Sequence, residues 1–254
     1  MPLYHHKITE NQNVFSTSGF DEFGHPVNYR SSIKAGCRFP IPNSGLVFYA
    51  SFNGNTPGTA ETGQSLSTYG SISYIKDGGI PCAYFGGSSY IYYPYSSGAL
   101  PSGSSPCTMS IWAKDTVNSG GALIGYGAPD VDNNNHRQIM LTPTWGIFLS
   151  NNSEGYVREP ATSFDNNWHH YCIVVNEKVG NYNNIQIFTD GILTKYGNLI
   201  ITTDTYGNLV FGTSAWDIGT WSLLKGYLAA ARIYNRVLTQ LEIKALCNEF
   251  NPID

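Results

Sequence analysis

The sequence predicts an all-β protein built from two packed antiparallel sheets, and three features of its 254 residues indicate this class. Charged residues make up only 13% of the chain, too few to cover the exposed faces of many helices. The 27 glycines, together with many asparagines and serines, suit short strands that are joined by turns. From residue 45 onward, apolar residues recur at alternate positions, which is the period of a half-buried strand. Many such strands separated by turn residues predict a sandwich or a barrel.

The expected strands follow one another along the chain, with turn residues between them. In residues 45–52 and 107–114, apolar side chains alternate with others, so each segment presents an apolar face. Residues 138–142 and 146–150 are expected to form a hairpin. Asp190-Gly191 is a strong signal for a second hairpin, with a two-residue turn. Further strands are expected at residues 83–87, 90–93, 122–127, 168–176, 185–189, 192–194, 209–212 and 226–234.

One short helix is expected near residues 240–247. Thr239 and Glu242 have the spacing of a capping box, in which the threonine hydroxyl and the glutamate carboxylate satisfy each other's backbone amides. Leu238 and Ile243 are placed as a hydrophobic staple around this cap. The helix is therefore expected to begin just after Thr239 and to pack across a sheet.

The chain is expected to divide near residue 40. Residues 1–40 lack sustained periodicity and end in the proline-punctuated segment 38–42, so we expect an arm or small adaptor that needs a partner surface to become ordered. Residues 41–254 are expected to form the β domain. The N-terminal residues hold no apolar run of the kind that a secretory signal needs, so we expect no export by that route unless a signal has been removed.

Charge and cysteine usage exclude several classes of partner. The net charge is −4 and the basic residues are scattered, so neither a nucleic-acid footprint nor a polybasic membrane patch is expected. No apolar stretch reaches the roughly 20 residues that span a bilayer. The five cysteines are irregularly spaced and lack a zinc-ligand pattern, which favours reduced, buried thiols. A bridge between Cys82 and Cys107 stays open at this point.

The order of the segments resembles the laminin-G-like branch of the concanavalin A-like lectin/glucanase superfamily. Each segment is weak evidence alone, but their order and spacing over residues 45–247 are specific. This resemblance implies a two-sheet antiparallel jelly-roll sandwich in which the first and last strands are adjacent. The matching segments are residues 45–52, 84–91, 108–114, 168–175, 187–191 and 224–243.

The resemblance also implies what a catalytic member would need. Enzymes of this fold carry two or three carboxylates on one strand in a Glu-x-Asp-x-Glu or related pattern, and a retaining pair lies roughly 5 Å apart. No expected strand here has acidic residues at that spacing; the closest approaches, Asp130 with Asp132 and Glu154 with Glu159, fall in loop-like surroundings. We therefore expect no enzymatic activity. His169-His170 is expected to begin a core strand, with one imidazole buried and one exposed.

Binding residues are expected in the loops and at strand ends, where aromatic rings occur beside amides and carboxylates. The candidates are Tyr92, Tyr93, Tyr95, Asp130, Asp132, Asn133, Trp145, Trp216, Asp217 and Trp221. Asp130 and Asp132 could also hold calcium, because their loop offers several oxygen donors, although it lacks the terminal bidentate glutamate of a full calcium loop. No other cofactor is expected.

These observations favour a non-catalytic recognition or adhesion module that binds a cell-surface glycan. A single shallow site would bind with a Kd of roughly 1 mM to 1 μM, so several copies would be needed for avidity. A phage fibre, decoration or tail component at the virion surface is one setting, with the arm bound to another virion protein and a homo-oligomer as one form. The alternative is a bacterial surface or secreted carbohydrate-binding protein. A glycoside hydrolase or lyase remains only if acidic residues from separate loops converge.

Overall fold

The computed structural model describes residues 40–54, 58–96, 98–116, 120–127, 136–142, 146–150, 156–159, 165–215, 218–220 and 223–250, preceded by two short strands. The chain divides into two units, residues 1–38 with 253–254, and residues 39–252. In the first unit, β1 (Gly19–Phe20) pairs with β2 (Pro26–Val27). That residues 1–40 act as an arm stays a prediction.

The second unit contains a seven-stranded antiparallel sheet among its described residues. Its strands are β4 (Ser67–Tyr69), β7 (Tyr90–Tyr95), β9 (Gly121–Gly127), β10 (His136–Thr142), β11 (Gly146–Ser150), β12 (Tyr156–Arg158) and β16 (Gly207–Phe211). Their order across the sheet is β12-β11-β10-β9-β16-β7-β4. The expected hairpin of β10 and β11 is confirmed.

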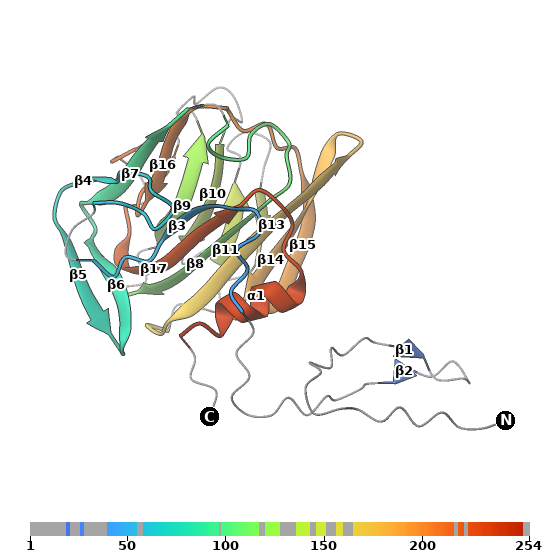
Figure 1. Cartoon of the computed structure of the whole chain (residues 1–254), viewed down its shortest axis with the longest axis horizontal. Helices are drawn as coiled ribbons and strands as arrows, with labels where there is room; N and C mark the ends of the chain where they lie inside the picture. Colours follow the sequence, from blue (N-terminus) through green and yellow to red (C-terminus); the bar gives the residue numbers. More distant parts are fainter. Residues whose placement is uncertain are drawn as a thin grey trace. The chain divides into compact units, whose positions relative to one another are not determined.

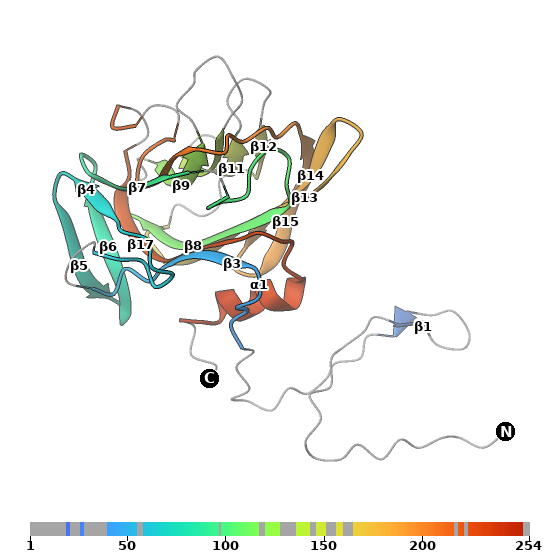
Figure 2. The ribbon, with the colours of Figure 1, turned by 45° about the horizontal axis from the view of Figure 1, so that its top comes forward.

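An eight-stranded antiparallel sheet packs against the first, and Figure 2 shows the two sheets as separate layers. Its strands are β3 (Leu46–Ala50), β5 (Ile72–Asp77), β6 (Ile80–Gly86), β8 (Cys107–Asp115), β13 (His169–Val179), β14 (Tyr182–Thr189), β15 (Ile192–Leu199) and β17 (Lys225–Tyr234). The order is β15-β14-β13-β8-β17-β6-β5, and β3 also pairs with β17. The expected turn at Asp190-Gly191 joins β14 to β15.

The last strand, β17, changes partner along its length (Figure 1). Its first half pairs with β6, its second half pairs with β3, and β8 lies along its other side. The register against β8 shifts between Ala229 and Arg232, and Ala230 there has a φ of 46°. A bulge of this kind bends a strand and re-aims its edge, which accounts for the change of partner. The expected adjacency of the first and last strands of the sandwich is confirmed by the β3–β17 pairing.

The core lies between the two sheets and is built from the inward-facing positions of both. Phe48 of β3 and Phe211 of β16 stack with ring centroids 5.6 Å apart, so the two sheets meet through aromatic contact. Met109 and Ile111 of β8 are fully buried in the same cluster. Burial of each such side chain contributes about 1.5–3 kcal/mol. The alternation that predicted these strands therefore reflects a shared apolar interior.

The helix α1 (Gln240–Cys247) lies against the outer side of the eight-stranded sheet (Figure 2). Thr239 is the N-cap, and both halves of the expected capping box with Glu242 are present. Leu238 and Ile243 are buried in the cluster between the helix and the sheet, which also holds Phe188. Helix formation here thus depends on one local cap and one apolar face.

The all-β sandwich with a short C-terminal helix is confirmed. The described cysteines, Cys82, Cys107, Cys172 and Cys247, are free and buried, so no Cys82–Cys107 bridge forms; Cys37 lies outside the described residues. Three strands of the sandwich were not expected from the sequence, namely β4, β5 and β12, and neither were β1 and β2 of the first unit. In the part of the chain that the structure describes, no helix is long and apolar enough to cross a membrane.

Candidate ligand-binding surface

Three tyrosine rings form a row on the outer face of the seven-stranded sheet. Tyr90 and Tyr92 are two residues apart on β7, so their side chains leave the same face of the sheet. Tyr69 of the neighbouring edge strand β4 pairs with Tyr90, and the two rings stack with centroids 5.0 Å apart and planes 16° apart. The Tyr90 and Tyr92 centroids are 6.0 Å apart. Tyr69 is 59% exposed, so the row is open to solvent at its β4 end.

A cavity of about 130 Å³ lies beside this row. It is lined by Tyr90, Tyr92, Asn208 of β16 and Ile218 of the loop that follows β16. None of these four described lining residues is charged. We call Tyr69 and these four residues the tyrosine surface. Aromatic walls with one amide are typical of pockets that bind a neutral ligand and orient it through few hydrogen bonds.

The described residues that follow β16 contact the outer face of the sheet at two places, Ser214 and Ala215 near β9 and β10, and Ile218 and Gly219 at the tyrosines. The Gln138 carboxamide oxygen on β10 accepts hydrogen bonds from Ser214 Oγ (3.0 Å) and the Ala215 amide (3.1 Å). A Cβ at Gly125 of β9 would lie 2.7 Å from the Gln138 Cβ, so only glycine permits this packing. Farther along, the backbone of Gly219 lies against the Tyr90 ring.

The Tyr90 hydroxyl of this surface acts as a neutral hydrogen-bonding group. Burial raises the pKa of Tyr90 above its ordinary value, and the charges that Tyr69 and Tyr92 would carry add to the shift. Tyr90 therefore stays protonated at neutral pH and can both donate and accept. Within the described residues, the side-chain amide of Asn208 makes no hydrogen bond, which leaves two donors and an acceptor for a ligand.

The structure separates the three tyrosines of β7 that the sequence analysis placed together. Tyr92 lies on the tyrosine surface. Tyr93 and Tyr95 point to the opposite face, because side chains alternate along a strand. Tyr93 packs against the core, and Tyr95 is buried with its hydroxyl donating to the Asp204 carbonyl (3.3 Å). Tyr93 and Tyr95 therefore lie at packing positions and not on the tyrosine surface.

The other candidate residues fall outside the described residues: Asp130, Asp132, Asn133, Trp145, Trp216, Asp217 and Trp221. Their roles stay predictions. The described ends of two of these loops do reach the tyrosine surface. Ile218 and Gly219 follow Asp217 directly. Gly127 and His136, which flank residues 128–135, pair with each other, and Gly127 also pairs with Asn208.

Tyr69, Tyr90, Asn208 and Ile218 were missed as candidates. The spacing of Tyr90 and Tyr92 was a usable signal, because two-residue parity puts them on one face and Tyr93 on the other. No comparable signal exists for Asn208, since its closeness to β7 depends on the order of strands in the sheet.

Three acidic residues elsewhere in the described chain, Glu159, Asp165 and Asp190, are engaged by neighbouring side chains. Glu159 accepts hydrogen bonds from Thr189 (2.9 Å) and Thr194 (2.6 Å). His169 lies between Asp190 (2.7 Å) and Asp165 (3.1 Å), and the Asp190 hydrogen bond is the main cause that raises the pKa of His169. His169 is therefore half-buried instead of exposed.

His170 is the buried imidazole of the pair, as expected, and is joined to Ser110 Oγ by a 2.8 Å hydrogen bond. Across the described ranges, no group of three or more His, Cys, Asp or Glu side chains could hold a metal ion. Calcium at Asp130 and Asp132 stays a prediction, as does the absence of catalysis.

The sandwich is similar to binding domains of known structure. Domain 4 of AbnA, a GH43 extracellular arabinanase from Geobacillus stearothermophilus, solved in complex with arabinotriose, has a TM-score of 0.58 and 20% identity, over 80% of this chain and 98% of that domain. The binding domain of Paraclostridial Mosquitocidal Protein 1 has a TM-score of 0.59 and 13% identity, over 81% of this chain and 52% of that one. A botulinum neurotoxin type C structure has a TM-score of 0.59 and 15% identity, over 80% and 51%.

At these identities the likeness shows a shared fold, and this chain spans about half the length of the two toxin chains. No curated protein sequence matches this chain. The laminin-G-like family model described as "Concanavalin A-like lectin/glucanases superfamily" matches residues 85–244, which is well over half of the chain. The matched region includes β7, β8, β9, β13, β16 and β17, which form the centres of both sheets. The chain therefore belongs to the concanavalin A-like lectin/glucanase superfamily.

Proposed function

We propose that the sandwich is a non-catalytic recognition module that binds a neutral carbohydrate at the tyrosine surface. The observation that carries this proposal is the row of Tyr69, Tyr90 and Tyr92 beside a cavity whose described lining offers a free amide and is uncharged. The faces of tyrosine rings supply broad, amphipathic contact for the C–H faces of a sugar. The Asn208 amide and the tyrosine hydroxyls supply donors and acceptors for the sugar hydroxyls.

One structural neighbour supports the ligand class more strongly than the others. The arabinanase domain is matched along 98% of its length and was solved with arabinotriose. The neurotoxin interacts with two ganglioside molecules, but only about half of its chain is matched. A short neutral oligosaccharide is thus the first ligand to test, with arabinotriose as the probe.

The test is isothermal titration of arabinotriose into the intact protein and into Tyr92→Ala. Loss of an aromatic wall from the cavity is expected to weaken binding at least about tenfold, the usual effect of truncating a central aromatic contact. Tyr196→Ala is the matched control, because Tyr196 is 70% exposed on β15 of the other sheet. Asn208→Ala gives a second variant that removes only the amide.

Equal affinity in all four proteins would contradict the proposed surface. Absence of binding by the intact protein, both to arabinotriose and across an array of neutral glycans, would contradict the proposed function. Thermal unfolding of each variant separates lost binding from lost folding.

The setting of this module in a phage particle is a separate proposal that the sequence alone supports. Residues 1–40 would attach the protein to a virion partner while the sandwich binds a host glycan, and adhesion would follow from several copies. Deletion of residues 1–40 should then abolish incorporation into particles and leave arabinotriose binding unchanged. Unchanged incorporation would contradict the attachment role.

A further inference from the structure

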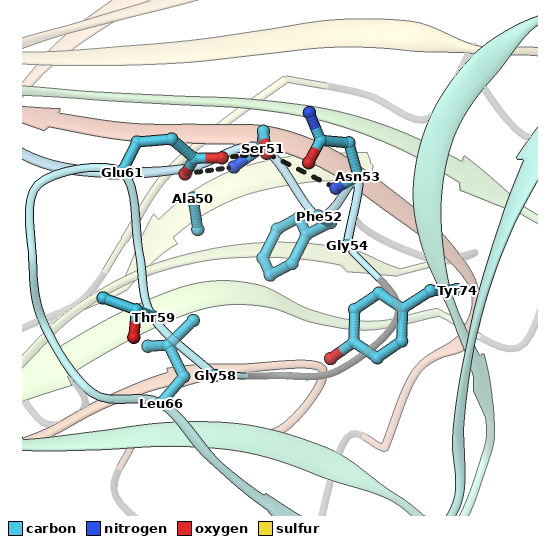
Figure 3. A pocket seen from close by; sticks show the side chains of 10 residues that line it. All are labelled: Ala50, Ser51, Phe52, Asn53, Gly54, Gly58, Thr59, Glu61, Leu66 and Tyr74. Carbon is cyan, nitrogen blue, oxygen red and sulfur yellow. Dashed lines mark hydrogen bonds between the residues drawn. The ribbon is translucent and has the colours of Figure 1, made fainter.

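A second cavity lies at the edge of the sandwich, at the end of β3, and its described lining residues differ from those of the tyrosine surface. Its volume is about 70 Å³, which suits a small polar group better than a polymer chain. We call it the edge cavity. Its polar and aromatic lining comprises Ser51, Phe52, Asn53, Thr59, Glu61 and Tyr74 (Figure 3).

The wall that carries Glu61 is fixed against β3. The Glu61 carboxylate accepts hydrogen bonds from the Ser51 amide (2.8 Å) and from the Ser51 hydroxyl. Two residues back along β3, the Tyr49 amide donates to Thr62 Oγ1 (2.9 Å), and the Tyr49 carbonyl accepts from the Glu61 amide (2.9 Å). The loop thus occupies the free edge of β3, and its carboxylate is held at the cavity.

The floor of the cavity contains a strained backbone position. Phe52 has a φ of 56°, in the left-handed region that bulky residues rarely adopt. Its ring is buried and meets Phe211 edge-on, with centroids 5.3 Å apart. Such strain persists only where the surroundings enforce it, and it occurs often at ligand sites. Here it sets the turn that brings Asn53 to the cavity beside Ser51.

The opposite wall carries a hydroxyl without a partner. The Tyr74 hydroxyl is buried and makes no hydrogen bond. In Figure 3 it is directed into the space between the Phe52 ring and Leu66. Burial raises the pKa of Tyr74 to about 12, so the hydroxyl stays protonated and can donate. A buried hydroxyl without a partner destabilises a fold, and phenylalanine would fill the same space without that loss.

We propose that the edge cavity is a second binding site, which takes the hydroxyl-bearing edge of a neutral sugar or of a smaller polyol. The Tyr74 hydroxyl would hydrogen-bond one ligand hydroxyl, and the Glu61 carboxylate would accept from another. An anion is disfavoured because Glu61, a carboxylate, is the one charged group among the described lining residues. An apolar ligand is disfavoured because it would leave the Tyr74 hydroxyl unsatisfied. The inference rests on the proposed function only for the class of ligand.

The decisive variant is Tyr74→Phe, because it should affect stability and binding in opposite directions. A hydroxyl that serves the ligand costs stability in the free protein but strengthens binding. Removal of an unsatisfied buried hydroxyl is expected to leave the melting temperature unchanged or to raise it. Loss of a ligand contact is expected to weaken binding at the edge cavity at least about tenfold, as when a polar partner is left unpaired. The matched control is Tyr126→Phe, since the Tyr126 hydroxyl is buried but donates to the Pro101 carbonyl at 3.0 Å. It should lower the melting temperature by about 2–4 °C and leave binding unchanged.

The probes are L-arabinose, D-glucose, D-galactose, N-acetyl-D-glucosamine and glycerol, each followed by saturation-transfer NMR on the full chain. The expected result is saturation transfer to at least one probe that persists in Tyr92→Ala and Tyr126→Phe and is lost in Tyr74→Phe. No transfer to any probe would overturn the inference. Saturation transfer that is unaffected by Tyr74→Phe would also overturn the inference, because it would show that the Tyr74 hydroxyl does not contact the ligand.

These outcomes are independent of the tyrosine surface. If Tyr92→Ala loses arabinotriose and Tyr74→Phe loses only the small probe, both sites stand. If Tyr74→Phe alone has an effect, the edge cavity stands and the tyrosine surface is wrong. A melting temperature of Tyr74→Phe that falls as far as that of Tyr126→Phe would show that the hydroxyl is already satisfied in the free protein, which contradicts the inference.

Discussion

The outer faces of both sheets carry aromatic side chains, but the two faces differ in how the rest of the chain covers them. On the eight-stranded sheet, α1 and residues 248–250 cover the face; the Trp112 indole donates to the Leu246 carbonyl (3.3 Å), and Phe250 packs edge-on against Trp112. On the seven-stranded sheet, Tyr69, Tyr90 and Tyr92 form a row that no helix of the described residues covers. We call these the closed face and the open face. On the closed face, Trp112 is covered by the chain itself, whereas on the open face Tyr69 stays exposed to solvent.

The two faces also differ in how they handle charge. On the closed face, Arg232 is 2% exposed, lies 3.9 Å from the Tyr49 ring centroid and makes a two-pronged ion pair with Glu249, both bonds 2.7 Å long. Among the described residues that line the cavity of the open face, none is charged. The closed face therefore contains a specific buried ion pair, whereas the described lining of the open-face cavity is neutral.

The largest expected effect comes from breaking that pair with Glu249→Gln. The substitution leaves Arg232 buried without a counter-charge, so the free energy of unfolding should fall by about 3 kcal/mol. Urea denaturation measures it, with the exposed Glu177→Gln on β13 as the control, for which a change within about 0.5 kcal/mol is expected.

The folded Glu249→Gln protein should bind arabinotriose normally, because the open face is untouched. A loss of stability below about 1 kcal/mol would show that apolar packing alone holds the closed face. Weakened binding in the folded variant would show that the two faces are coupled.

The second prediction concerns one buried histidine on each face. His136 on the open face has no hydrogen-bond partner for either ring nitrogen, and burial lowers its pKa from 6.5 to about 4. His170 on the closed face is hydrogen-bonded to Ser110, and burial, as the main cause, lowers its pKa to about 3. Both folded-state pKa values lie below the unfolded value. The stability that the two neutral imidazoles provide is therefore fully present above about pH 6.5 and is lost as the pH falls toward 4.

As the pH falls from about 6.5 toward 4, each of these histidines should lower the free energy of unfolding by about 1.4 kcal/mol for each pH unit. His136→Leu is therefore expected to unfold with a pH dependence that is shallower by this amount between pH 6 and about pH 4.5, with little loss at pH 7. His169 acts with the opposite sign, since its pKa is raised, and it is unchanged in the variant. Identical slopes for the two proteins would mean that His136 is protonated in the folded state.

The sequence predicted which residues form strands better than it predicted which strand faces are covered. In β8 it predicted one apolar face, with Thr108 and Ser110 on the other. Both residues are in fact buried. The Thr108 hydroxyl donates to the Arg236 carbonyl (2.9 Å), and the Ser110 hydroxyl is hydrogen-bonded to His170. The partner of Thr108 lies 128 residues away. Alternation of apolar and polar residues predicts a strand, but it does not predict which distant segments cover the polar face of that strand.

The candidate site was predictable to the same extent. Parity along β7 is a local property, so Tyr92 could be found and Tyr93 could have been excluded. The cavity itself needs Asn208 and Ile218, which reach Tyr92 through the β16–β7 pairing and through a loop held by Gln138. Both depend on long-range topology. The edge cavity was missed for a related reason, since an unsatisfied hydroxyl at Tyr74 is visible only once its surroundings are in place.

The smallest expected effect is that of Thr239→Ala at the start of the helix on the closed face. Thr239 Oγ1 accepts from the Glu242 amide (3.3 Å), and the Glu242 carboxylate accepts from the Thr239 amide (2.8 Å). Loss of the first bond should lower the free energy of unfolding by about 1 kcal/mol. The effect stays small because Leu238 and Ile243 keep their apolar contacts with the sheet. Thr239→Ser keeps the hydroxyl and should recover most of the loss. A loss near that of Glu249→Gln would mean that the cap, and not the apolar face with its ion pair, holds the helix on the sheet.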